Sequence, residues 1–285
     1  MHAGLRNRLL LLPVVVLVAG CDVHVGNLSA RATDEWTHTY PLKPGGEIQI
    51  ENTNGKIEVE GTDAATVEVR AERIAKGATD AAARELLPRI VIKEDATPDR
   101  VAVRTERMGG IMIGASFEVR YHVRAPRNAV VNVSNTNGQV TLTGLNGKVI
   151  AHTTNGQVRG DTLTGAVEAR TTNGGVNMDL SSIGNEPVRL HTTNGGVTLT
   201  LPDSAKADIS ASVTNGGISV GDFQNLDVGE KTRRRFEAKL NGGGAAIELE
   251  TTNGGVRIRP RNAVATDDSD NERDDRLKRL RDRNR

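Results

Sequence analysis

Thr192-Thr193-Asn194-Gly195-Gly196-Val197 is one of seven copies of a short phrase that decides the fold of this 285-residue chain. Every copy contains an Asn-Gly pair directly after a threonine, and its turn asparagines are Asn54, Asn137, Asn155, Asn173, Asn194, Asn215 and Asn253. From the second copy onward these asparagines lie 18, 18, 21, 21 and 38 residues apart, and the last interval is close to two periods. A period near 20 residues is typical of stacked units that are each too small to bury their own apolar face.

Apolar and polar residues alternate on both sides of each Asn-Gly pair. In one copy Val188 and Leu190 precede the phrase, and Val197 and Leu199 follow it. Strict alternation predicts strands that bury one face and expose the other. Val213 replaces the first threonine of the phrase in one copy, so we expect this first threonine to point inward and the second to point outward.

Two arrangements of these strands fit the pattern. In a parallel β-helix, or β-solenoid, with coils of 18–21 residues, each coil lies on the previous one. The turn asparagines then stack into a buried column, because an amide side chain carries both donors and acceptors. In a meander or propeller, Asn-Gly makes a two-residue hairpin and the strands pair across it. We favour the solenoid, because the bend recurs in register while the return segments vary in length.

The N-terminal segment has the features of an export signal. Arg6 and Arg8 precede an apolar run from Leu9 to Val18, and Ala19-Gly20-Cys21 follows. Ten helical residues rise only ~15 Å, about half of a ~30 Å hydrocarbon core, so we expect no permanent membrane span. Cys21 is the only cysteine. The segment resembles a bacterial lipoprotein signal, in which the cysteine is acylated; a plain signal peptide with an incidental thiol is the alternative. Several acyl chains, which the resemblance implies, anchor a protein stably.

These signals divide the chain into five parts. We expect a signal peptide over 1–20, a tether over 21–34, a first coil with a small α+β capping insertion over 35–126, the repeat array over 127–261 and a charged, disordered tail over 262–285. Within the insertion, the pattern predicts a short helix over 78–87 and strands over 90–92, 101–104 and 117–123. Arg233-Arg234-Arg235 interrupts the repeat; we expect a solvated loop there, with an anion contact as the alternative.

Three features together resemble a known bacterial family. They are the Pro44-Gly45-Gly46 entry followed by Ile48 and Ile50, the Asn-Gly-x-Val/Ile phrases, and Arg124-Ala125-Pro126 before the main array. Over about residues 35–260 the chain resembles a family described as candidate adhesins, which are domains of unknown function. The resemblance implies an all-β, right-handed parallel β-helix and an adhesin-like role. Where the family often has Asp after the turn glycine, this chain has Gln139, Gln157 and several Gly-Gly pairs.

The sequence shows no arrangement of residues that is typical of a catalytic or metal site. His152 and His191 share one outward column, but two coils separate them by ~9–10 Å with Arg170 between, so we expect no metal site. Glu168 and Arg189 are expected to form a surface ion pair. Neither a glycosidase carboxylate pair nor a calcium repeat, phosphate loop or nucleophile elbow is recognisable. We therefore expect no catalytic residues, no metal and no cofactor. The net charge of +1 does not favour nucleic acid.

One outward column remains as a candidate binding face. It contains Thr141, Arg159, Asn177, Thr198, Ser219 and Arg257. We expect an exported, membrane-anchored lipoprotein on the periplasmic or outer-surface side of the envelope, held to lipid through acylated Cys21. It would act as a non-catalytic adhesin or scaffold that contacts a surface polysaccharide or an envelope protein. A solvated face without a ligand, a polysaccharide-acting β-helix enzyme, and a partner of an envelope-stress sensor or sigma-factor system are the alternatives.

Overall fold

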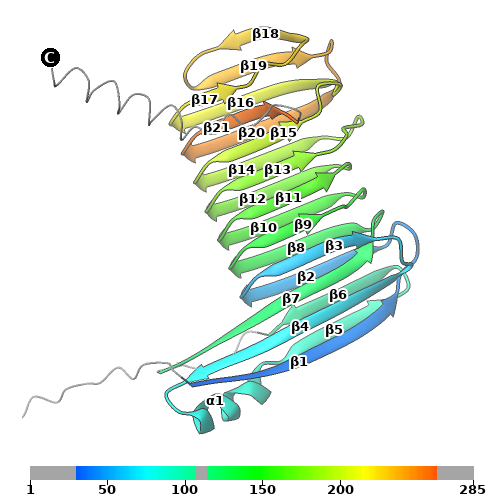
Figure 1. The fold of residues 1–285 in the computed structure, drawn as a ribbon, viewed down its shortest axis with the longest axis vertical. Coiled ribbons are helices and arrows are strands. Elements are labelled where there is room, and N and C mark those ends of the chain that lie inside the picture. Colours follow the sequence, from blue (N-terminus) through cyan, green and yellow to red (C-terminus); the bar gives the residue numbers. More distant parts are fainter. Residues whose placement is uncertain (1–29, 107–113, 262–285) are drawn as a thin grey trace, which may run out of the picture.

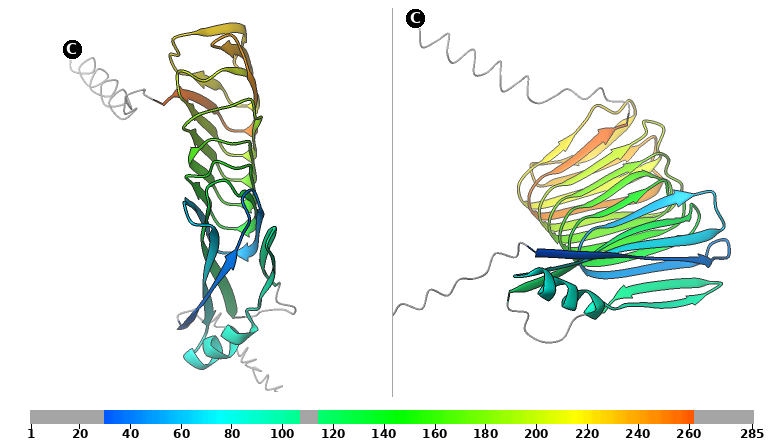
Figure 2. Two further views of the ribbon diagram at one scale, coloured as in Figure 1. Left: turned by 90° about the vertical axis from the view of Figure 1, so that its right-hand side faces the viewer. Right: turned by 60° about the horizontal axis from the view of Figure 1, so that its bottom comes forward.

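A computed structural model describes residues 30–106 and 114–261 of the chain. The described residues form two open β-sheets that face each other along a rod, with one short helix at one end (Figures 1 and 2). Within them, no helix has the length and apolarity needed to cross a membrane. The expected signal peptide, Cys21 and the charged tail lie outside the described residues.

Seven coils build the rod, and each gives one strand to each sheet. The first strand of a coil lies in the eleven-stranded sheet, called sheet B here, and the second lies in the ten-stranded sheet A. In chain order the coils are β2 (Glu47–Asn54) and β3 (Ile57–Thr62), β8 (Val130–Asn137) and β9 (Val140–Thr143), β10 (Val149–Asn155) and β11 (Val158–Leu163), β12 (Val167–Asn173) and β13 (Val176–Leu180), β14 (Val188–Asn194) and β15 (Val197–Leu201), β16 (Ala207–Asn215) and β17 (Ile218–Val220), and β20 (Ala245–Asn253) and β21 (Val256–Pro260).

Neighbouring coils pair in parallel and in register. Asn155 lies beside Asn173 and Val158 beside Val176, which is the spacing of one coil. The two strands that flank an Asn-Gly bend belong to different sheets, so the hairpin alternative is wrong. The expected all-β solenoid fold is confirmed.

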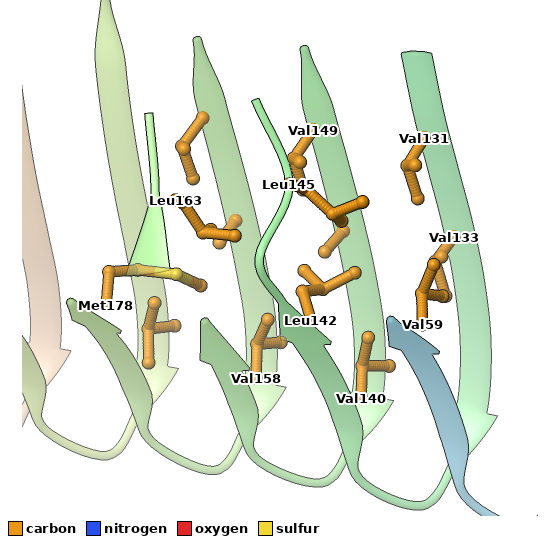
Figure 3. Packing of buried hydrophobic residues seen from close by; sticks show 14 of the residues in the cluster. Val59, Val131, Val133, Val140, Leu142, Leu145, Val149, Val158, Leu163 and Met178 are labelled. Atoms are coloured by element: carbon orange, nitrogen blue, oxygen red, sulfur yellow. The ribbon is translucent and has the colours of Figure 1, made fainter. Parts of the chain in front are cut away.

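The core is a narrow apolar layer between the two sheets. Inward-facing aliphatic side chains of successive coils stack on one another, as Val140, Leu142 and Val158 do in sheet A opposite Val131 and Val149 in sheet B (Figure 3). All five are completely buried. A single coil has only a few such side chains, so its burial depends on the coils on either side.

The stacking order of the coils departs from the order of the sequence. The coil of β20 and β21 lies between those of β14–β15 and β16–β17, so that Asn253 pairs with both Asn194 and Asn215. The 38-residue interval is therefore not two stacked periods. Its extra residues form β18 (Leu226–Lys231) and β19 (Arg235–Leu240), an antiparallel hairpin whose second strand pairs with the outer edge of β16 (Figure 1).

Asn241 stabilises the crossing, which is the place where the chain passes back over itself to insert the last coil between two earlier ones. The segment that connects β19 to β20 passes the segment that connects β15 to β16, and the Asn241 amide donates to the carbonyl oxygens of Asp203 and Ala205 at 2.7 Å each. Its Oδ1 also accepts from Asn225 at 3.1 Å. Asn241 has φ +50, a left-handed conformation that asparagine tolerates better than most residues.

The opposite end of the rod is covered by the remaining strands. Sheet A is extended by β7 (Ala115–Pro126), β4 (Thr66–Gly77) and β1 (Ala30–Pro41), and sheet B by β6 (Arg100–Thr105) and β5 (Ile92–Thr97). The helix α1 (Asp80–Leu86) continues into the 3₁₀ turn η1 (Leu87–Arg89). Two expected boundaries were wrong. Residues 30–34 of the expected tether belong to β1, and the expected strand over 90–92 begins only at Ile92, because η1 extends the helical segment to Arg89.

An aromatic cluster joins the two sheets at this end. Trp36 stacks on His38 with ring centroids 4.4 Å apart, and both His38 and Tyr40 bond the carboxylate of Glu94 on the other sheet. Burial, together with Glu94, raises the pKa of Tyr40 above its usual range, so that its hydroxyl stays protonated and donates. The cluster closes the gap between the edge strands β1 and β5.

Candidate functional site

A continuous ladder of asparagine side chains runs along one corner of the rod. Each turn asparagine donates from Nδ2 to Oδ1 of the asparagine in the preceding coil, over six bonds of 2.7–2.9 Å. In space the ladder runs Asn54, Asn137, Asn155, Asn173, Asn194, Asn253 and Asn215. The expected buried column is wrong, because these side chains lie on the outside of the bend; all but the half-buried Asn54 are exposed.

A second row of hydrogen bonds lies just inside the ladder. The first threonine of the phrase is buried and donates to the turn-glycine carbonyl of the neighbouring coil, as Thr192 does to Gly174 at 2.8 Å and Thr251 to Gly195 at 2.8 Å. The second threonine points outward and is exposed or half-buried. The bends are therefore fixed from both sides, which makes the adjoining outer face of sheet A a rigid surface.

The candidate binding face is one straight row on sheet A. Its residues are neighbours in the parallel register, with a spacing of ~4.8 Å between strands. The row runs Thr141, Arg159, Asn177, Thr198, Arg257 and Ser219, so the crossing exchanges the last two members of the expected column. Arg159 bonds Asp161 at 2.8 Å, and this bond raises the pKa of the guanidinium further above its usual range.

A strip without side chains borders this row. The residue after the turn glycine is Gly175, Gly196, Gly255 and Gly217 in four spatially consecutive coils, whereas Lys56, Gln139 and Gln157 occupy this position in the first three. A Cβ atom at Gly196 would lie 3.4 Å from the nearest atom, the carbonyl oxygen of Gly255, which is an ordinary contact. The fold does not require glycine there, and the strip leaves the backbone open to a ligand.

The outer face of sheet B carries charged pairs. His152 and His191 do lie in one column with Arg170 between them, and each histidine faces a glutamate. The expected Glu168–Arg189 pair was wrong. Glu168 lies 3.1 Å from Arg170, and Arg189 bonds Glu248 at 3.2 Å, because the crossing places Glu248 beside it.

Two carboxylate groupings were missed in the sequence. Asp161 and Asp179 come from neighbouring strands of sheet A, but an arginine pairs with each: Arg159 with Asp161, and Arg261 with Asp179 at 3.5 Å. Four exposed carboxylates also rim a groove of about 410 Å³ on sheet B, namely Asp208, Asp227, Glu237 and Glu248. Among residues 30–106 and 114–261, no three or more Asp, Glu, His or Cys side chains are arranged to hold a metal ion.

The array also matches a known family. Residues 122–259 match the Toastrack DUF4097 family. The Toastrack segment begins in β7 and ends in β21, which is just under half of the chain and includes six of the seven coils. The expected resemblance to a family of domains of unknown function is confirmed. All six residues of the candidate face lie inside the Toastrack segment, whereas Asn54 and its coil lie outside it although they continue the same ladder.

Several solved structures match the chain at low sequence identity and with low TM-scores. A candidate cell adhesion protein from Clostridium sporogenes is 12% identical, with 80% of this chain and 100% of that chain covered and a TM-score of 0.46. A candidate adhesin from Bacteroides fragilis is 11% identical, with 80% and 97% covered and a TM-score of 0.32. A candidate adhesin from Parabacteroides merdae is 13% identical, with 81% and 96% covered and a TM-score of 0.28. No curated protein matches the chain in sequence.

Proposed function

We propose that this chain is a non-catalytic binding module of the cell envelope, anchored through Cys21 and using the outer face of sheet A. The in-register row from Thr141 to Ser219 supports this proposal most strongly. It presents one polar or charged side chain per coil, at intervals of ~4.8 Å, on a surface whose backbone is fixed. The residues that match the Toastrack family include the whole of this row.

The repeat of the row favours an extended, repeating ligand. Hydroxyl, amide and guanidinium groups supply donors along the whole row, and hydroxyl and amide groups also supply acceptors. Each contact to such a ligand is weak, but contacts made at several coils by one polymer add through a high effective concentration. The strip formed by Gly175, Gly196, Gly255 and Gly217 admits the polymer close to the backbone. A surface polysaccharide is the partner that fits this surface best, and an extended segment of an envelope protein is the second.

A binding measurement with paired variants tests the face. A screen of the purified protein against glycans and envelope proteins first identifies the surface glycan that it binds. Asn177→Ala combined with Thr198→Ala should then weaken binding to this glycan about 10-fold or more, because two donor–acceptor groups are lost. The control, Ser134→Ala combined with Ser212→Ala, removes two hydroxyl groups from sheet B. Equal losses from both double variants, or hydrolysis of the glycan by the parent protein, would contradict the proposal.

Substitution of the anchoring residue tests the location. Cys21→Ser should move the protein from the detergent phase to the aqueous phase after detergent partitioning, because it removes the thiol that the acyl chains modify. Metabolic labelling with a fatty acid should mark the parent protein and leave the variant unlabelled. A variant that still partitions with detergent would show that another segment holds the protein to the membrane.

A further inference from the structure

A cluster of unpaired arginines forms the tip of the β18–β19 hairpin. Thr232 fixes the backbone of this turn, since its Oγ1 accepts from the backbone N–H groups of Arg234 and Arg235 at 3.3 and 2.9 Å. The carbonyl of Arg234 accepts from Val213 at 2.9 Å, which attaches the tip to β16. The side chains of Lys231, Arg233, Arg234 and Arg235 are all exposed. The turn therefore presents four cations from a rigid backbone.

The pairing of arginines elsewhere on the rod makes this cluster unusual. Most described arginines lie within 4.0 Å of a carboxylate, namely Arg31, Arg70, Arg73, Arg100, Arg120, Arg124, Arg127, Arg159, Arg170, Arg189 and Arg261. Within residues 30–106 and 114–261, the three tip guanidinium groups make no such pair and no side-chain hydrogen bond. These like charges repel one another, and Glu230 and Glu237, which pair further along the hairpin, are the carboxylates that follow the tip in the register.

We propose that this tip docks on an anionic phospholipid surface. Guanidinium groups bind phosphate oxygens in pairs of hydrogen bonds, and they lose less hydration than ammonium groups when they do so. The cations lie at the turn of a hairpin at the end of the rod, which suits contact with a plane rather than with a polymer lying along a groove (Figure 1). Val228, further along the same hairpin, is 44% exposed and adds an apolar side chain at this end of the rod.

The position of the tip gives the contact a direction. β1 enters the rod at one end and the β18–β19 hairpin lies at the other (Figure 1). Sheet B runs from β18 to β5 over eleven strands, which corresponds to ~48 Å between these two edge strands. If the chain is anchored through Cys21, as proposed above, the tip lies at the side of the rod end that is farther from the anchor (Figure 1), where it meets a second surface. Only this orientation rests on the proposed anchor; the affinity of the tip for phospholipid does not.

A vesicle-flotation measurement tests the tip. The full chain carrying Cys21→Ser is used, so that no acyl chain contributes, with vesicles of phosphatidylcholine alone and of phosphatidylcholine mixed with phosphatidylglycerol. The protein should bind the mixed vesicles more strongly than the neutral ones, and this preference should fall as salt is raised. Substitution of Arg233, Arg234 and Arg235 by Gln should lower the partition coefficient about 100-fold, at about fivefold for each arginine.

Matched variants separate the tip from the overall charge. Arg84→Gln, Arg89→Gln and Arg104→Gln together remove the same charge from three exposed, unpaired arginines at the other end of the rod, and should change partitioning less than about fivefold. Replacing the three tip arginines by Lys should retain most of the binding to the mixed vesicles. If the triple Gln variant unfolds, the single variant Arg233→Gln replaces it in the measurement.

Equal losses from the tip and control variants would overturn the proposal. So would binding that survives loss of the tip, or an equal affinity for neutral vesicles. Tip-dependent binding to a phosphorylated polysaccharide without binding to vesicles would assign the tip to a polymer and would also overturn it. None of these results depends on whether Cys21 is acylated.

Discussion

Gly195→Ala should lower the free energy of unfolding by about 3 kcal/mol, because it forces a side chain into the stacking contact between two coils. A Cβ atom at this position would lie 1.9 Å from the carbonyl oxygen of Gly174 and 2.5 Å from its carbon. Real atoms do not approach so closely, so the coils must separate locally. Separation also stretches the Thr192–Gly174 hydrogen bond and the Asn194–Asn173 bond of the ladder. Urea unfolding followed by circular dichroism measures the effect.

The next residue supplies the control for this substitution. Gly196→Ala adds the same methyl group one position later, where the nearest atom lies 3.4 Å away. We expect the free energy of unfolding to change by less than about 1 kcal/mol, because alanine restricts the unfolded chain and this offsets the added contact. Similar losses from Gly195→Ala and Gly196→Ala would show that the close approach of the bends does not limit stability.

Local patterns predicted most of this architecture. The alternation around each Asn-Gly pair identified the two strands of a coil, and Val213 in the slot of the first threonine correctly placed that threonine inside. Both signals depend on a few adjacent residues and on the period of the repeat. They were enough to predict the in-register stacking and the residues of the candidate face, because parallel neighbours in a solenoid occupy equivalent positions in the repeat.

The order of the last coils could not be predicted in this way. β16 and β20 carry the same alternation and the same Asn-Gly phrase, so each fits the edge of β14 by its local pattern. Non-local contacts accompany the observed order, above all the bonds from Asn241 to Asp203 and Ala205 and the pairing of β19 with the outer edge of β16. The same crossing explains why Arg189 pairs with Glu248 and why Arg257 precedes Ser219 in the binding row.

The glycine strip and the arginine tip show a similar limit. A sequence shows that glycine follows glycine in four coils, but only the packing shows that the first glycine is required sterically and the second is not. Likewise, the sequence alone predicts a solvated loop at three adjacent arginines. The structure adds that most arginines elsewhere on the rod are paired with a carboxylate, whereas these three are not. Both features are defined by comparison with equivalent positions in the fold.

Cysteine cross-linking tests the stacking of the coils most directly. His191 and Glu250 are neighbours in the parallel register, and Ser212 lies beyond Glu250. In a Cys21→Ser background, His191→Cys with Glu250→Cys should oxidise to an intramolecular disulfide, because neighbouring strands lie ~4.8 Å apart. His191→Cys with Ser212→Cys should remain reduced, because the two residues are two strands apart at ~9–10 Å. A disulfide in the second pair and none in the first would show that β14 lies directly beside β16, as the order of the sequence suggests, and would contradict this structure.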